Sequence, residues 1–449
     1  MRWQNILVAA VSGLSAMAMA AQQHKDTATE YSYRMAASII SRGQGIMTGS
    51  GGSSELLQAG FTQKAFTALL VKYAETGQNE TRDKNGFMHK VRQYIIDSAE
   101  SVVPFVGNAT KDALSYPMDR LSNGNALLAL SERAYPGANL TTAALRAAAR
   151  ALRDSIDLNR RNDEGGLWYY TYPYWSYLDG MYSLAPFYSQ WALVGPAGNR
   201  TNATTKPSLD DMVLQLDLLW QHCHNETSGL LVHGYDASKT AVWADAITGA
   251  SPHVWGRSLG WYAMALVDTL EILTTSSSSS HAQPASPLSS SSSSSSCIDL
   301  GPYSADILAK FRSLASAIIA AADPTTSAWW QVLDQPGREG NYIESSGSAM
   351  FAYALLKGSR LGYLDDDDDD TAQREQAVDL GTKATTYLTN NFVVDNGNGT
   401  LGYNGTVSVC SLNSTASYDY YIGQPINYNS VLGSAAYVLA SLEVERLGS

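Results

Sequence analysis

The sequence predicts an all-α fold built from helical hairpins, and three observations support this. Apolar residues recur at intervals of four, three and four in several separate stretches, which is the spacing of one helix face. The alternation of apolar and polar residues that marks half-buried strands is scarce by comparison. Segments rich in Gly, Asn, Tyr and Pro, such as 162–173 and 395–428, separate the helices and are long enough to carry a functional site.

The first residues have the features of a secretory signal peptide, which we place at 1–21. Arg2 supplies the positive start, residues 6–20 form an apolar run, and residues 18–20 match an A-x-A cleavage site. The run is too short and too rich in small residues to span a bilayer. We therefore expect residues 22–449 to form a single secreted, extracellular catalytic domain that does not partner a membrane.

Asn-x-Ser/Thr sequons are numerous, which fits export and suggests a eukaryotic secretory pathway. They begin at Asn79, Asn108, Asn139, Asn199, Asn202, Asn225, Asn398, Asn404 and Asn413. Their polar, turn-like surroundings predict a solvent-facing surface. The mature protein is therefore expected to be a glycoprotein.

Charge and cysteine content restrict the partners and the cofactors. The net charge of −12 argues against nucleic acid or an anionic membrane as a partner. The three cysteines, Cys223, Cys297 and Cys410, allow at most one internal disulfide, whose pairing the sequence leaves open. Their spacing does not suit zinc. We expect no metal or other cofactor, and a monomer.

The helical stripes follow one another along the chain. They cover residues 145–156, 209–220, 259–273 and 431–442. The second stripe should begin at Ser208, because a serine directly after a proline is a favourable helix start.

Two segments read as insertions between helices. Residues 274–296 are dominated by serine and cannot bury enough apolar surface to order themselves, so we expect a flexible surface loop. Residues 365–370 are six consecutive aspartates. A calcium loop needs spaced ligands and a turn glycine, so a solvated acidic loop is favoured over a calcium site.

The stretch 233–271 resembles a sugar-acid pocket in its chemistry. Trp255 and Trp261 offer flat apolar faces to a pyranose ring. Arg257 offers a planar donor fork that matches a carboxylate in two hydrogen bonds. The alternative is that the tryptophans are core residues and that Arg257 is an ordinary ion-pair partner.

Two aspartates are candidates for the catalytic carboxyl groups. Asp179 lies among aromatic residues in TYPYWSYLDGMYSLAPF, where burial would favour a protonated acid, and Gly180 would permit close approach of the substrate. The alternative role of Asp179 is a helix N-cap. Asp119, in SYPMDRLSNGNALLAL, could instead pair with Arg120 or cap a turn. Sequence spacing does not show whether Asp119 and Asp179 meet.

Three long blocks, at 165–182, 233–271 and 329–364, together with the closing segment NYNSVLGSAAYVLASLEVE, resemble glycoside hydrolase family 105 in consistent order. These are the unsaturated rhamnogalacturonyl hydrolases, relatives of the unsaturated glucuronyl hydrolases. The resemblance covers most of the chain from about Tyr116 onward and implies an (α/α)6 six-hairpin barrel. The segment 42–68 departs from the family pattern because it lacks an aromatic-rich opening, which leaves the outer subsites undefined.

The resemblance also implies roles for individual residues. Asp179 stands at the catalytic aspartate, and Asp119 matches a second acidic position. His233, Trp255, Arg257 and Trp261 match residues around an unsaturated uronic acid.

We therefore expect a secreted glycosidase that hydrates the 4,5-double bond of an unsaturated galacturonic acid at the non-reducing end of rhamnogalacturonan, a pectin. Asp179 would protonate C4 and a carboxylate would help water add at C5. The alternatives are an unsaturated glucuronyl hydrolase, another helical-barrel glycosidase or lyase, and a non-enzymatic glycan-binding protein. The linked sugar and the pH optimum are left open.

Overall fold

The computed structural model describes residues 31–50, 52, 54–75, 86–194, 202–281, 298–365 and 371–448. The signal peptide, Asn79, Asn199 and Cys297 lie outside these ranges. An unlabelled helix at 31–41 is followed by α2 (Glu55–Glu75), α3 (Phe87–Val106), α4 (Ala109–Ser115), η1 (Met118–Asn123), α5 (Gly124–Ser131), α6 (Thr142–Leu158), α7 (Asp179–Val194) and α8 (Asn202–Cys223). The second half contains α9 (Gly256–His281), α10 (Gly301–Ala320), α11 (Ser345–Arg360), α12 (Ala372–Phe392), α13 (Tyr418–Ile422) and α14 (Val431–Leu447).

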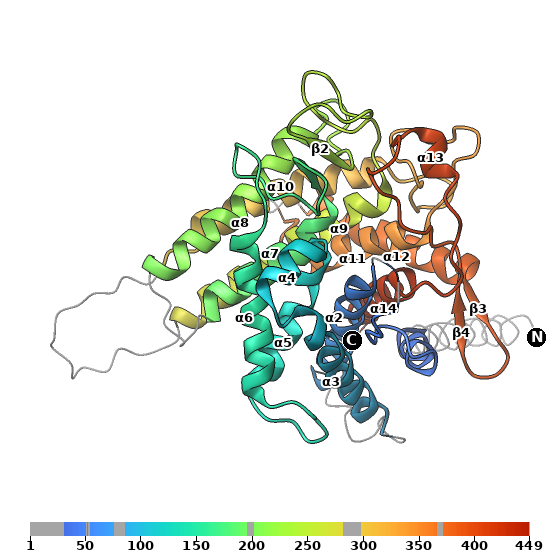
Figure 1. Ribbon diagram of the computed structural model, residues 1–449. Helices are drawn as coiled ribbons and strands as arrows, with labels where there is room; N and C mark the ends of the chain where they lie inside the picture. The colour runs from blue at the N-terminus through green and yellow to red at the C-terminus, as the bar shows by residue number, and fades with distance from the viewer. Residues whose placement is uncertain are drawn as a thin grey trace, which may run out of the picture.

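The helices form the barrel that the sequence predicts. Among the described residues, the ring of inner helices runs α2, η1 with α5, α7, α9, α11 and α14, and each packs against the next. The ring closes because α14 packs against α2, which brings the two ends of the described chain side by side (Figure 1). The helices α3, α6, α8, α10 and α12 pack outside this ring. This is the (α/α)6 barrel, and the all-α prediction is confirmed.

Inner and outer helices differ in how their side chains are buried. The outer helix α6 is amphipathic: Thr141 caps its start by accepting from the Ala144 N–H, and its predicted stripe from Leu145 to Ile156 faces the core. The inner helix α14 is buried on nearly every face over 431–443. A helix apolar all round belongs inside a protein, so the stripe predicted at 431–442 understates the burial of α14.

Two short antiparallel ribbons lie at the ends of helices. In the first, β1 (Trp175–Tyr177) pairs with β2 (Gly234–Asp236), with Tyr177 opposite Gly234. In the second, β3 (Val393–Asp395) pairs with β4 (Leu401–Tyr403). The first ribbon matters for function, because it holds the segment before Asp179 against the segment after His233.

The boundaries of two predicted segments are wrong. Helix α8 begins at Asn202, not Ser208, and Pro207 lies within it. The additional first turn packs against α7, where buried Thr205 donates to the Ala192 carbonyl, and this tertiary contact outweighs the proline signal.

The predicted loop at 274–296 is helical at its start, because α9 continues to His281. There Thr274 and Ser277 donate to carbonyls one turn earlier, Leu270 and Leu273, so these hydroxyls are compatible with the helix. The remainder, 282–296, lies outside the described residues, as do aspartates 366–370.

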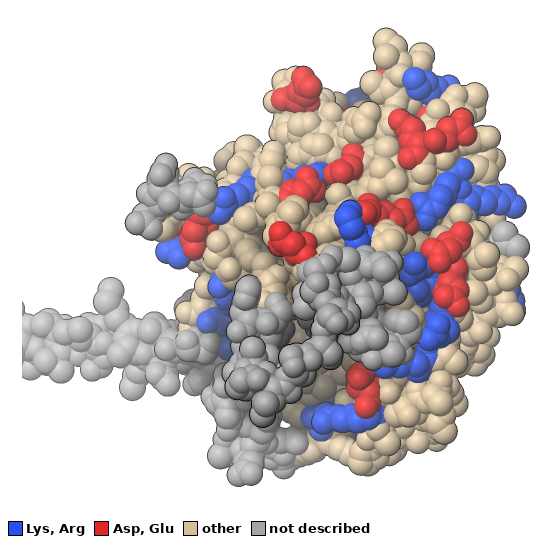
Figure 2. Space-filling view, turned by 90° about the vertical axis from the view of Figure 1, so that its left-hand side faces the viewer, with Lys and Arg blue, Asp and Glu red and all other residues tan. Residues whose placement is uncertain are grey.

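Surface features bear on the predicted partners. Figure 2 shows acidic and basic side chains intermixed over one face, with no large basic patch visible on it. In the described ranges, every helix is too short or too polar to cross a membrane. Six sequon asparagines, Asn108, Asn139, Asn225, Asn398, Asn404 and Asn413, are exposed. Cys223 and Cys410 are buried free thiols.

Candidate active site

A cavity of about 350 Å³ opens where the inner helices begin. Its walls include residues 54–57 at the start of α2, Asp119 in η1, Asp179 at the start of α7, and Arg257 near the start of α9. Aromatic side chains complete the walls: Tyr116, Tyr169, Tyr170, Tyr172, Tyr177, Phe105, Trp255 and Trp261. Five of the six site residues predicted from the sequence thus meet in one cavity, and the sixth, His233, lies behind Asp179.

Close packing of η1 against α7 brings the two aspartates to the same cavity. A side chain at Gly180 would place its Cβ 3.1 Å from Met118 Sδ and 3.4 Å from the Tyr169 ring. Gly180 is buried, so its small size serves this packing and not the close approach of substrate expected from the sequence. The Asp119 and Asp179 elements can therefore lie close together, which sequence spacing alone could not show.

Asp119 is buried, and the Tyr169 hydroxyl donates to its Oδ1 over 2.8 Å. Burial and the negative charge of Asp179 raise the pKa of Asp119 to about 7, against the lowering effects of Tyr169 and Arg120. The Arg120 guanidinium donates to Ser155 and to the Tyr116 carbonyl, among others. Asp119 therefore keeps a proton up to near-neutral pH, as an acid catalyst requires.

Replacing Asp119 by asparagine should stabilise the protein at alkaline pH. The folded pKa lies above the unfolded value, so the folded state binds more protons between about pH 4 and pH 7, and stability falls as pH rises through this window. The variant removes this penalty, on the order of 4 kcal/mol, while an amide oxygen can still accept from Tyr169. Denaturant unfolding at pH 5 and pH 8 checks this; equal pH slopes for both proteins would contradict the raised pKa.

Asp179 is held by residues from two other segments. The Ser258 hydroxyl of α9 donates to Asp179 Oδ2, and His233 Nε2 lies 3.3 Å from the same oxygen without hydrogen-bond alignment. His233 is fully buried, and its Nδ1 lies 2.8 Å from the Tyr421 hydroxyl. His233 is thus placed to position Asp179, whereas the sequence suggested direct substrate contact. The sequence did not identify Ser258 as a site residue, because a serine near the start of a helix is usually interpreted as an N-cap.

The tryptophans line the cavity while being largely buried. Trp255 donates its indole N–H to Gln331, and its ring lies 4.8 Å from the His233 ring. Trp261 packs against Phe61 at 4.8 Å and Tyr182 at 4.5 Å. We call Phe61, Tyr182 and Trp261 the aromatic floor, because Trp261 lines this cavity and Tyr182 lines a second cavity deeper in the barrel. Both readings offered by the sequence, core residue and pocket residue, therefore apply to Trp261.

The guanidinium N–H groups of Arg257 donate to backbone carbonyls of the protein itself. One terminal nitrogen donates to the Val407 carbonyl over 2.5 Å and the other to the Ser408 carbonyl over 2.6 Å, while the guanidinium stacks on Trp255. Glu344 accepts from the Val407 N–H, so both backbone groups of Val407 are held. The guanidinium is 1% exposed and needs these acceptors. Arg257 therefore fixes the segment that leads to Val409, Cys410 and Ser411 in the cavity wall.

Replacing Arg257 by lysine should loosen this segment, because an ammonium group cannot hold two carbonyls in a fixed fork. We expect a raised KM together with faster amide hydrogen exchange over 407–412. Lys239→Arg, in the 238–241 turn and outside the cavity lining, serves as the control. A raised KM with unchanged exchange would instead indicate that Arg257 clamps the substrate carboxylate directly.

The segment 42–68, which departs from the family pattern, forms one side of the cavity. Met47, Gly49, Gly52 and Glu55 line it, together with Leu56 and Leu57. Gly49 adopts a φ of +76°, and a Cβ there would clash with the Phe105 ring at 2.7 Å. There was little indication of this wall in the sequence, since most of its residues are small or aliphatic and carry no chemistry specific to a sugar acid.

Metal and thiol chemistry find little support among the described residues. No group of three or more His, Cys, Asp or Glu side chains in these ranges is arranged to hold a metal ion. Burial raises the pKa of Cys410, the one cysteine lining the cavity, to about 12, so it stays a thiol near neutral pH.

Comparison with known proteins places the chain in a family of glycoside hydrolases. The profile of Glycosyl Hydrolase Family 88 matches residues 65–294 and 300–448. This chain belongs to that family. The chain is also similar to the structure of a family 105 glycoside hydrolase from C. acetobutylicum. The two are 29% identical with a TM-score of 0.71, and the match covers 93% of this chain and 99% of the other.

Two further relatives complete the comparison. The unsaturated glucuronyl hydrolase of Bacillus sp. GL1 shares 14% identity and the fold, with a TM-score of 0.58 over 94% of this chain and 97% of that one. Protein Atu3128 of Agrobacterium fabrum is 33% identical to this chain over 224 residues, which cover 49% of this chain and 83% of the relative. The identification with family 105 is confirmed, and the protein is a glycoside hydrolase of the unsaturated uronyl hydrolase family.

Proposed function

We propose that this enzyme hydrates the 4,5-double bond of an unsaturated galacturonic acid at the non-reducing end of rhamnogalacturonan fragments. The observation that supports this most strongly is the convergence of Asp119 and Asp179, from separate elements, in a single aromatic cavity. The aromatic faces suit the C–H side of a sugar ring. A vinyl ether can be hydrated by proton transfer to carbon followed by addition of water, and carboxyl groups can supply and accept the protons of both steps.

The two carboxyls act as one acid–base pair in this proposal. Burial and the negative charge of Asp179 raise the pKa of Asp119 to about 7, so Asp119 can hold the proton that the pair supplies near neutral pH. Asp179, held by Ser258 and His233, delivers the proton to C4 of the double bond. The pair, now deprotonated, accepts a proton from the water that adds at C5. The resulting hemiketal then opens, which releases the attached sugar and a keto-uronate.

Export is also part of the proposal. The charged start and apolar run of residues 1–21 support a secreted protein, and the exposure of the six described sequon asparagines makes glycosylation sterically accessible. We propose a monomeric, extracellular enzyme that acts on pectin fragments produced by a polysaccharide lyase. Endoglycosidase-induced mass shifts of the secreted protein test the glycosylation.

A pair of matched disaccharides tests the catalytic proposal. Unsaturated galacturonyl-rhamnose should be consumed with loss of the ultraviolet absorbance of its conjugated double bond, whereas the saturated disaccharide should remain intact. The proposed reaction requires protonation of a C=C bond, which the saturated sugar lacks. An unsaturated glucuronyl disaccharide serves as the second arm. Equal turnover of saturated and unsaturated sugars would indicate ordinary glycoside hydrolysis, and preference for the glucuronyl substrate would reassign the specificity.

A further inference from the structure

The His233 ring contacts a second side chain besides Asp179, that of Tyr421 in α13. The Tyr421 hydroxyl lies 2.8 Å from His233 Nδ1, and both side chains are fully buried. The other ring nitrogen, Nε2, lies 3.3 Å from Asp179 Oδ2. Three side chains that are far apart in the sequence therefore form a row that ends at Asp179 in the active-site cavity.

Packing fixes the positions of the two buried rings. The ring centre of Trp255 lies 4.8 Å from that of His233 and 6.3 Å from that of Tyr421. The Gln331 side chain donates to the Tyr421 carbonyl. The Leu178 N–H donates to the His233 carbonyl. The Tyr421 hydroxyl and His233 Nδ1 are thus held at hydrogen-bond distance in a buried place, where an unmade hydrogen bond is costly.

The direction of this hydrogen bond decides which nitrogen of the neutral His233 ring carries the proton. Burial raises the pKa of Tyr421 well above its usual value, so the hydroxyl keeps its proton and needs an acceptor for it. Among the described residues, His233 Nδ1 is the acceptor within hydrogen-bond distance of this hydroxyl. Nδ1 is then the unprotonated nitrogen, and the proton is on Nε2, which faces Asp179.

The Nε2–H tautomer suits the catalytic carboxyl group. An N–H directed at a carboxylate oxygen attracts it, whereas a nitrogen lone pair in the same place would repel it. The Ser258 hydroxyl donates to the same oxygen of Asp179, so two donors face Oδ2. This leaves Oδ1, on a carboxyl group that lines the cavity, as the oxygen from which a proton passes to the sugar.

We propose that Tyr421 is a positioning residue for Asp179: its phenol donates to His233 Nδ1, sets the Nε2–H tautomer and so directs a donor at Asp179 Oδ2. Tyr421 does not line the active-site cavity, so it acts through His233 and not on the sugar. The kinetic consequence rests on the proposed function. The tautomer does not, because a buried histidine has one without substrate.

NMR of the intact, substrate-free protein with labelled histidine nitrogens tests the tautomer. His233 should show a protonated Nε2 and an unprotonated Nδ1, and the variant His233→Gln identifies these signals by losing them. Tyr421→Phe removes only the hydroxyl, so the Nδ1 signal should move to that of a nitrogen without a hydrogen bond. A proton on Nδ1 of the wild type, in a neutral or a charged ring, would overturn the proposal whether or not Tyr421→Phe folds.

The kinetic arm uses whichever unsaturated disaccharide the wild type consumes. Tyr421→Phe should lower kcat at least ~tenfold, the scale of one hydrogen bond, with KM unchanged, because Tyr421 does not touch the sugar. An unchanged kcat in the folded variant would overturn the role of Tyr421. The two possible failures are distinguishable: lack of turnover of every unsaturated sugar refutes the proposed function, and the NMR arm still decides what sets the tautomer.

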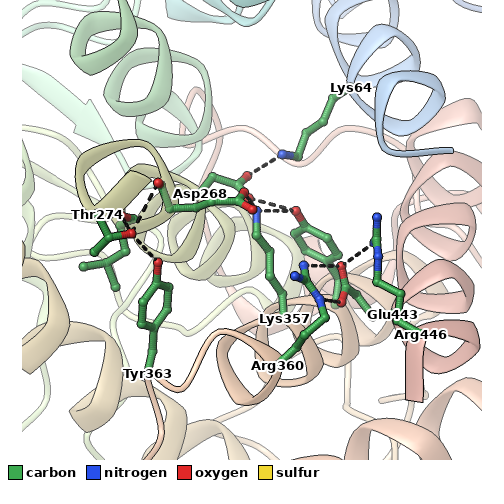
Figure 3. A network of polar contacts seen from close by, with 11 residues as sticks. Lys64, Asp268, Thr274, Lys357, Arg360, Tyr363, Glu443 and Arg446 are labelled. Carbon is green, nitrogen blue, oxygen red and sulfur yellow. Dashed lines mark hydrogen bonds and ion pairs between the residues drawn. The ribbon is translucent and has the colours of Figure 1, made fainter. Parts of the chain in front are cut away.

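The matched control is Tyr353→Phe. Tyr353 is also a buried tyrosine whose hydroxyl donates to a buried side chain, in this case Asp268, at the centre of the ion-pair network drawn in Figure 3. It lines the second cavity and not the active-site cavity. Tyr353→Phe should leave kcat and the His233 signals as in the wild type. An equal fall in kcat in both variants would indicate a general effect of removing a buried hydroxyl and would contradict a specific role for Tyr421.

Discussion

Replacing Asp179 by asparagine is expected to lower kcat by at least ~10²-fold, the usual scale of general acid–base catalysis. The amide is nearly isosteric and can still accept from Ser258, but it cannot transfer a proton to the sugar. Folding should be unaffected, since the local packing depends on Gly180 and Met118. Steady-state decay of the enol-uronate absorbance measures kcat, and circular dichroism checks the fold.

Asp157→Asn is the control for this measurement, because Asp157 is 61% exposed and pairs with Arg153 away from the cavity. It should leave kcat unchanged. A folded Asp179→Asn protein with nearly full kcat would show that Asp179 is only the first residue of α7, and the site assignment would have to be abandoned.

Replacing Asp268 by asparagine should cause the largest loss of stability, about 3–5 kcal/mol, because it leaves two lysines in a buried site without their shared carboxylate. Although burial disfavours its charge, Lys357 and Lys64 lower the pKa of Asp268 to about 2. This folded value is below the unfolded value, so the stabilisation is present above about pH 4 and is lost as pH falls through about 2. Denaturant unfolding of both proteins at pH 7 measures the difference.

Asp379→Asn provides the comparison, because Asp379 and Lys383 form an ion pair whose side chains are about 60% exposed. Its effect should stay within about 0.5 kcal/mol. If Asp268→Asn is no more damaging than Asp379→Asn, the ion pairs of Asp268 with Lys64 and Lys357 contribute little to folding, and water must screen them more effectively than their burial suggests.

Helices and most of the cavity wall were predictable from local patterns. The stripe at 145–156 repeats with the helical period, and Asp179, Trp255 and Arg257 stand in runs of residues suited to sugar acids. The helix boundaries were less predictable. Pro207 signals a start, yet a hydrogen bond from Thr205 to a neighbouring helix extends the helix backwards.

Partnerships across the barrel could not be read from the chain. Arg257 donates to carbonyls about 150 residues away in the sequence. A guanidinium that binds a substrate carboxylate and one that holds Val407 therefore look the same in the local sequence. The network around Asp268 joins α2, α9 and α11, and no local spacing marks it. The described wall residues Met47, Gly49, Gly52 and 54–57 are mostly small or aliphatic, and α2, which carries the last of them, is positioned by its packing against α14.

The aromatic floor determines how a polymer can meet this enzyme. Phe61, Tyr182 and Trp261 contact one another, with Trp261 lining the active-site cavity and Tyr182 lining the second one. Because these rings lie between the two cavities, we expect a polysaccharide to present only a terminal sugar to the carboxyl groups. The proposed enzyme would then be exo-acting, and its product would have to leave before the next chain end enters.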